Sequence, residues 1–280
     1  MTFLPAIPLT GLVGWRVFQE SAPRQQEVFE RQPLVQKNVA HFRENASTAL
    51  TAADLVADRR LLSVALGAFG LEEEINKRAL IRRVLEEGTI ERDAFANRLN
   101  DKRWRDFAET FGYGDGVGAR VLSPAFQESI ISRYLERAFE ASVGEVDTDM
   151  RLASNFRREA LEIANGEDVD RVGWFEIMGQ RPLRAVMEAA LGLPTSIGTA
   201  DIDQQRDLFA DKFQNVFGVD SLSALRDPDV MDAVLQRFFL QSELQNGPSA
   251  STPGAAALSI LSGPSSNSLQ AANLFNSNLI

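Results

Sequence analysis

A short pattern recurs three times in this chain, and it constrains the fold more than any other feature. Each copy starts with one or two basic residues, continues with apolar residues at helical spacing and stops at a glycine followed by a leucine or a tyrosine. The copies span residues 58–71, 101–113 and 180–193. The first and third align without a gap, whereas the second needs one residue deleted. The repetition predicts one helical unit that is used three times.

Apolar residues elsewhere follow the same helical period, for example over residues 130–139, and no comparable run with a period of two stands out. Helix start signals agree with this interpretation. Ser123-Pro124 and Asp227-Pro228 each place a capping side chain before a proline at the first helical position. We therefore predict an all-α protein, a multi-helix globular body of about ten helices with internally repeated helical units.

The composition changes at both ends of the chain. Residues 1–21 are apolar and contain Pro5 and Pro8, which predicts an irregular N-terminal arm. Residues 22–245 form the repeat-containing body, with a candidate sub-boundary near 144–150. Residues 246–280 carry no charge and are rich in Ser, Ala and Asn, a low-complexity composition that cannot build a packed core of its own.

Both ends nevertheless contain large apolar side chains. Those of the arm must either dock on the body or meet a partner. For the tail, two alternatives stay open: it orders on a partner or on its own body, or it is disordered with incidental apolar residues. The candidate partner-binding residues are Leu12, Trp15, Phe18, Leu258, Leu261, Leu274 and Phe275.

Composition excludes several classes of chemistry. The chain has no cysteine, which removes disulfides, thiol nucleophiles and thiolate metal sites. His41 is the only histidine, so no second imidazole can share a metal or a proton relay with it. A net charge of −10 makes nucleic acid an unfavourable partner. No stretch is long and apolar enough to span a membrane, and residues 1–17 do not form a usual Sec signal peptide.

Three motifs resemble functional sites but have simpler structural interpretations. Four Asp-x-Asp pairs lie near predicted helix starts, where carboxylates cap the free amides more often than they bind a cation. The glycine-rich segment 112–118 follows a helix rather than a strand, so we expect a flexible connection instead of a phosphate loop. Basic pairs such as Arg157-Arg158 are expected to be solvated faces. We predict no catalytic, cofactor-binding or metal-binding residue.

Several blocks of the sequence resemble a known family. They are residues 54–71, 96–104, 174–184 and 190–194, which occur in order within a match that covers most of residues 10–245. The family is a bacterial, mainly alphaproteobacterial, domain of unknown function, number twelve-seventeen. Its members are often encoded among flagellar genes, and some carry the label of flagellar rod-like protein. The resemblance implies a role in motility without enzymatic activity, and it offers no catalytic residue to carry over.

Together these observations predict a non-enzymatic structural or interaction protein associated with the bacterial flagellum. Its expected partner is a protein, with flagellar components as candidates, and its expected location is the flagellum or the cytoplasm. The first alternative is a cytoplasmic helical binding module or secretion chaperone that holds a partner helix in a groove. The second is a carboxylate-dependent metal hydrolase.

Overall fold

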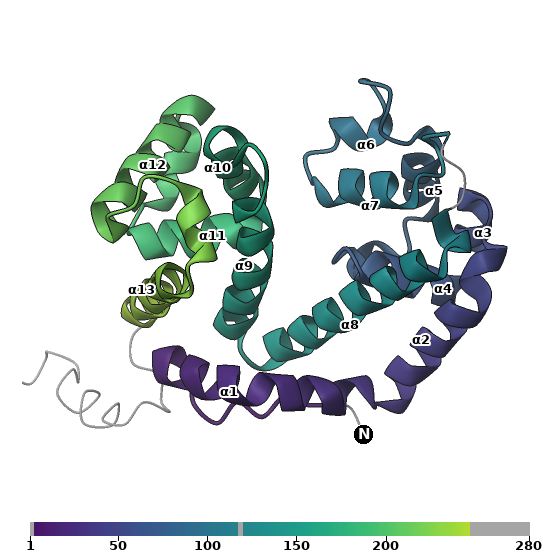
Figure 1. The fold of residues 1–280 in the computed structure, drawn as a ribbon, viewed down its shortest axis with the longest axis horizontal. Helices are drawn as coiled ribbons and strands as arrows, with labels where there is room; N and C mark the ends of the chain where they lie inside the picture. Colours follow the sequence, from purple (N-terminus) through teal and green to yellow (C-terminus); the bar gives the residue numbers. More distant parts are fainter. Residues whose placement is uncertain (1–2, 117–119, 247–280) are drawn as a thin grey trace, which may run out of the picture.

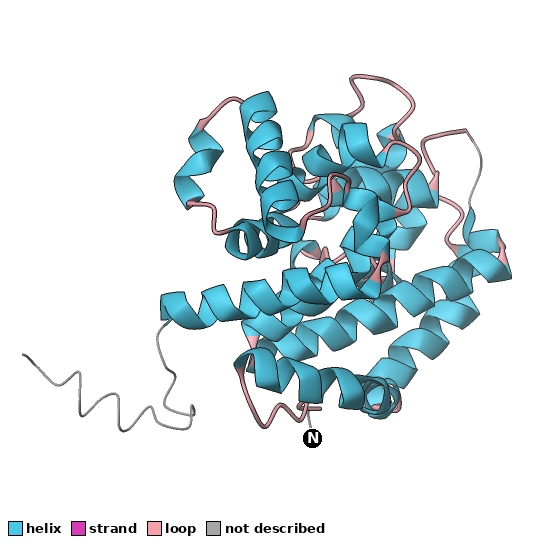
Figure 2. Ribbon diagram, turned by 60° about the vertical axis from the view of Figure 1, so that its left-hand side comes forward, coloured by secondary structure: helices cyan, strands magenta, loops and turns pink. Residues whose placement is uncertain are grey.

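The computed structural model describes residues 3–116 and 120–246, and within these ranges the chain is helical without a strand (Figure 2). This confirms the all-α prediction. Thirteen α-helices are present in the described ranges, and 11 of them have seven residues or more, compared with the expected ten or so. No helix in these ranges is long and apolar enough to cross a membrane.

The helices form two lobes above a long base (Figure 1). In the base, α1 runs along the lower edge of the molecule and α8 rises from it. The helices of the base and the first lobe are α1 (Gly11–Glu30), α2 (Pro33–Asn45), α3 (Ala52–Ala57), α4 (Arg59–Gly67), α5 (Arg78–Glu87), α6 (Phe95–Arg98), α7 (Arg103–Phe111) and α8 (Pro124–Val146). Those of the second lobe are α9 (Thr148–Ala164), α10 (Val169–Gly179), α11 (Arg181–Leu191), α12 (Ile202–Phe217) and α13 (Pro228–Asn246).

A sharp bend separates α8 from α9. Asp147 alone connects the two helices, with an extended backbone at φ −147° and ψ 111°. Its carboxylate accepts a hydrogen bond from the Met150 amide at 3.0 Å and so caps α9. One hydrophobic core nevertheless runs through both lobes and the base. The structure therefore redirects the chain at 147, and the sub-boundary near 144–150 stays a prediction.

The three sequence repeats become α4, α7 and α11. Each is followed by a glycine with positive φ, at Gly70 (+67°), Gly112 (+70°) and Gly192 (+66°). This left-handed conformation is open to glycine at little cost, which explains why the pattern ends there. The amides of Leu71 and Leu193 then donate back to the preceding turn at 2.9 and 2.8 Å. The repeat is thus a packing unit, because its apolar stripe is buried in every copy.

The N-terminal arm is shorter than the sequence suggested. Only residues 3–10 are irregular, and from Gly11 onward the chain is helical. Trp15 and Phe18 are 4% and 3% exposed, and their rings contact Phe239 and Phe139 at 5.5 and 6.3 Å. Trp15 and Phe18 share one helical face and pack into the core. The irregular arm predicted from Pro5 and Pro8 is therefore wrong for residues 11–21.

The candidate partner-binding residues therefore need correction. Trp15 and Phe18 are core residues rather than a partner surface, and Leu12 packs against the same core. Of the two alternatives for the arm, docking on the body holds. The tail residues Leu258, Leu261, Leu274 and Phe275 lie outside the described residues.

Candidate interaction site

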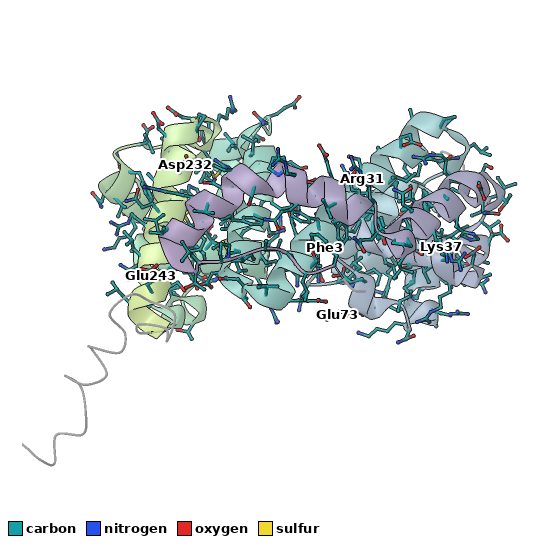
Figure 3. All side chains as sticks on the ribbon, turned by 90° about the horizontal axis from the view of Figure 1, so that it is seen from below. Phe3, Arg31, Lys37, Glu73, Asp232 and Glu243 are labelled. Atoms are coloured by element: carbon teal, nitrogen blue, oxygen red, sulfur yellow. The ribbon has the colours of Figure 1, made fainter. Side chains whose placement is uncertain are left out.

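Residues 3–10, here called the strap, are fastened along α1. The Gln25 side chain accepts from the Ala6 amide at 2.7 Å and donates to the Ala6 carbonyl at 3.1 Å. The strap begins in an aromatic cluster. The centre of the Phe3 ring lies 5.4 Å from that of Phe29 and 6.2 Å from that of Phe139. Figure 3 shows Phe3 against the body beside α1.

Phe3 also lines the larger of two hollows described here, a cavity of about 860 Å³ that we call the groove. The groove lies between the end of α1, the start of α2, α4 and α8. Its walls are mainly apolar, and its lining includes five small residues, two from α4 and three from α8. These small residues are Ser63, Gly67, Ala138, Ala141 and Ser142.

The small residues make close approach possible. A methyl group added at Gly67 would meet the Tyr134 ring at 2.8 Å, closer than real contacts allow. The absence of this methyl lets the ring lie across α4, with its hydroxyl accepting from the Asn38 amide at 3.2 Å. Leu34 also lines the groove, although it is 71% exposed.

An ion-pair network connects the groove to the second hollow. Arg137 lines the groove and pairs with Glu159, which lines the second hollow. Arg158 pairs with the same Glu159 at 2.5 Å and with Glu140 at 2.8 Å. Burial lowers the pKa of Arg137. For Arg158 burial acts in the same direction, but hydrogen bonds and charges from Glu140 and Glu159 outweigh it and raise the pKa.

The second hollow, the inter-lobe cleft, measures about 520 Å³ and lies between α7, α9 and α10. Asp106, Glu162 and Glu176 line it, and none of the three has a hydrogen bond or ion pair within the described part of the chain. Partial burial, assisted by the charges of Glu159, Glu109 and Glu176, raises the pKa of Asp106 to about 6. Burial also raises the pKa of Glu176.

His41 has a partner that the sequence did not reveal. Its Nε2 lies 2.7 Å from the Asp58 carboxylate, and Asp58 also accepts from the amides of Arg60 and Leu61 at 2.8 and 3.0 Å. Burial raises the pKa of Asp58, but the hydrogen bonds from Leu61, His41 and Arg60 hold it below its ordinary value. The pair thus joins α2 to the start of α4, a structural role.

The Asp-x-Asp pairs act mainly as helix caps, as predicted. Asp147, Asp201 and Asp227 each accept from a backbone amide at the start of α9, α12 or α13. The exception is Asp168, which makes no cap hydrogen bond and pairs instead with Arg171 at 2.5 Å. Within residues 3–116 and 120–246, no group of three or more His, Asp or Glu side chains could hold a metal ion.

The glycine-rich segment is anchored over residues 112–116, contrary to the flexible connection that we expected. Asp115 accepts from the amides of Thr89 and Ile90 at 2.6 and 3.3 Å. Gly114 lies so close to Gly88 that an added methyl would be 2.3 Å from its nitrogen. The glycines therefore serve a close backbone contact, which spacing alone does not distinguish from a hinge. Residues 117–118 lie outside the described part.

Comparison with known proteins places the chain in a family. It is similar to a protein of Agrobacterium tumefaciens, determined by X-ray crystallography for a structural genomics consortium, with 28% sequence identity and a TM-score of 0.68. The match covers 84% of this chain and 94% of that one. No curated protein matches. The sequence pattern of a family described as proteins of unknown function, DUF1217, matches residues 68–231, more than half of the chain. The protein therefore belongs to the DUF1217 family.

Proposed function

We propose that this protein is a non-enzymatic interaction protein and that its groove holds a helix of a partner protein. The observation that carries the proposal is the groove itself, about 860 Å³ with apolar walls and small residues on α4 and α8. Small side chains let a partner backbone come close. Apolar walls make the binding of an amphipathic helix favourable, because the helix buries its apolar stripe against them. The exposed Leu34 gives such a helix an apolar contact at its edge.

Charge narrows the expected partner. Glu72 and Glu145 line the groove together with Arg137, whose charge is already matched by Glu159. Glu145 has no ion-pair partner within the described residues, and Glu72 has only Arg151 at 3.8 Å. A partner helix with lysine or arginine beside its apolar stripe would therefore gain from these carboxylates.

We further propose that the partner belongs to the bacterial flagellum. The support for this setting is the resemblance to a family whose genes often lie among flagellar genes. The alternative setting is the cytoplasm, where a helical binding module would act as a secretion chaperone. Cell fractionation separates the two, because a structural role requires the protein in the basal-body or exported fraction.

The groove is tested by one substitution and a matched control. Leu34→Asp places a charge in the groove, whereas Ile90→Asp alters a side chain that is equally open, 70% against 71% exposed, but lies outside it. Both changes are at the surface and should leave the fold intact. Cross-linking in motile cells, followed by purification, should recover the same flagellar protein with wild type and Ile90→Asp.

With Leu34→Asp, recovery of that protein should fall by about tenfold, because one buried apolar anchor is lost. Equal recovery with both variants would reject the groove as the binding site. Recovery of no flagellar protein, together with normal swimming after gene deletion, would reject the flagellar setting.

A further inference from the structure

The outer face of α1 is uncovered. Val13, Val17, Glu20, Arg24 and Val28 are all exposed and follow one another at steps of three and four residues, so they form one row along the helix. The opposite face is buried in the core. Figure 1 shows α1 along the lower edge of the molecule, and Figure 3, seen from below, shows it in front of the body with no other described helix over it.

The row is apolar near both ends and charged in the middle. Val13, Val17 and Val28 are 64%, 40% and 47% exposed. Glu20 and Arg24 lie between them, and neither has an ion-pair partner within the described residues, although their spacing would allow them to pair with each other. Two charges of opposite sign, neither of them in an ion pair, therefore stand one helical turn apart on an exposed face.

This arrangement is self-complementary under a two-fold axis. If two copies of α1 pack antiparallel with the axis near residue 22, Glu20 lies opposite Arg24 of the partner subunit, and the reverse pair forms by symmetry. The same register places Val17 opposite Val28 of the partner subunit. A parallel arrangement would instead set each charge against its own copy.

We propose that the protein forms a homodimer through antiparallel packing of the outer faces of α1. A second copy of the chain is the occupant that the row fits, because in one register Val17 meets Val28 of the partner subunit and Glu20 meets Arg24 of the partner subunit.

The expected dimer is of modest affinity. A helix of 20 residues is about 30 Å long. The strap runs beside it and adds the exposed side chains of Leu4 and Leu9, 68% and 40% open. An interface of this extent is at the small end for specific association, so we expect a dissociation constant on the order of 10 µM.

Charge reversal tests the proposal with the full-length chain in sedimentation velocity at several concentrations. Glu20→Arg alone and Arg24→Glu alone each turn both symmetric pairs repulsive and should weaken the dimer by about tenfold or more. The double variant Glu20→Arg with Arg24→Glu restores opposite charges and should return to near wild-type affinity. As a control, Arg82→Glu on α5 changes an exposed residue away from α1 and should have no effect on the dimer.

Cross-linking tests the register, since the chain has no native cysteine. Mixing the single variants Val17→Cys and Val28→Cys should give a mixed disulfide under mild oxidation, in preference to either like pair. A protein that is monomeric at 100-fold above the expected dissociation constant (~1 mM) would overturn the proposal. So would a dimer that is insensitive to both charge reversals, or one that yields mainly the Val17→Cys like pair.

Discussion

The groove and the inter-lobe cleft lie on opposite sides of the α8–α9 bend, yet they differ in how they treat charge. In the groove, Arg137 is paired with Glu159 and Glu72 with Arg151, so only Glu145 lacks an ion pair within the described residues, and much of the remaining surface is apolar or small. In the cleft, Asp106, Glu162 and Glu176 have no ion-pair partner within the described residues. The groove can therefore bind an apolar partner favourably, whereas the unpaired carboxylates of the cleft depend on water for their hydrogen bonds.

The difference teaches which hollow is built for contact. Burying the groove under a helix would remove apolar surface from water, a favourable change. Burying the cleft would desolvate three carboxylates that have no ion pair, together with Lys102 and Arg105, which also line it, and this is an unfavourable change. Glu159 belongs to both hollows, because it lines the cleft and neutralises the arginine of the groove.

The largest expected effect comes from breaking this connection. Glu159→Gln keeps the shape of the side chain but leaves Arg137 and Arg158 with one carboxylate fewer, where their side chains are only 21% and 12% exposed. We expect the free energy of unfolding to fall by about 3 kcal/mol, since an uncompensated buried charge is costly. Urea denaturation measures it.

The matched control is Glu162→Gln, three residues along the same helix in the cleft. Glu162 is exposed and has no ion pair in the described structure, so its neutralisation should change stability by less than about 0.5 kcal/mol. If both variants lost a similar amount of unfolding free energy, the ion pairs of Glu159 would contribute no more to stability than the unpaired Glu162 does.

The sequence predicted the local features of the fold. Helix repeats and their glycine stops follow from spacing over one or two turns. Accordingly, α7 and α11 end directly before the glycine of the pattern, and α4 ends three residues before Gly70. Capping by Asp147, Asp201 and Asp227 is equally local. The length of the N-terminal arm was predicted wrongly, because Pro5 and Pro8 affect only the residues next to them and α1 already begins at Gly11.

Neither hollow could be predicted, because each depends on residues far apart in the chain. The Asn38 to Tyr134 hydrogen bond in the groove spans 96 positions, and the His41 to Asp58 pair joins two helices with no shared motif. The pairing of Arg137 with Glu159 requires the bend at Asp147, whose direction tertiary packing decides. A single sequence contains no period or spacing that reports such contacts.

Glycine substitutions in the two hollows sharpen the comparison at an intermediate magnitude. Gly67→Ala in the groove places a methyl group 2.8 Å from the Tyr134 ring, whereas Gly179→Ala in the cleft meets no atom within 4 Å. Strain should outweigh the better helix propensity of alanine at Gly67, with a net loss of about 1 kcal/mol. Gly179→Ala should instead gain about 0.5 kcal/mol.

Thermal unfolding of the two variants gives shifts of opposite sign. Asn38→Ala removes the hydrogen bond to the Tyr134 hydroxyl and frees the ring to move. If contact with the Tyr134 ring causes the loss of stability in Gly67→Ala, this loss should be smaller when Gly67→Ala is combined with Asn38→Ala. A gain in stability at both glycines would show that the groove is no more closely packed than the cleft.

The smallest expected effect is a pH dependence that belongs to the cleft. The pKa of Asp106 is raised to about 6, whereas in the unfolded chain it should be near the ordinary value of about 3.9. Between these values the folded state binds more protons than the unfolded state, so this group makes stability fall as pH rises from about 4 to 6. Because more than a third of the surface of Asp106 stays open to water, solvent screening limits the effect to about 1 kcal/mol or less.

Asp106→Asn removes the group without changing its size. The variant should be slightly more stable than wild type at pH 8, and the difference should disappear near pH 4, where wild-type Asp106 is itself protonated. Asp58 acts in the opposite direction, because its lowered pKa adds stability above about pH 4 that is lost as the pH falls. Urea titrations of wild type and Asp106→Asn at several pH values cancel the contribution of Asp58, which is the same in both proteins. A stability difference that stays constant with pH would contradict the raised pKa of Asp106.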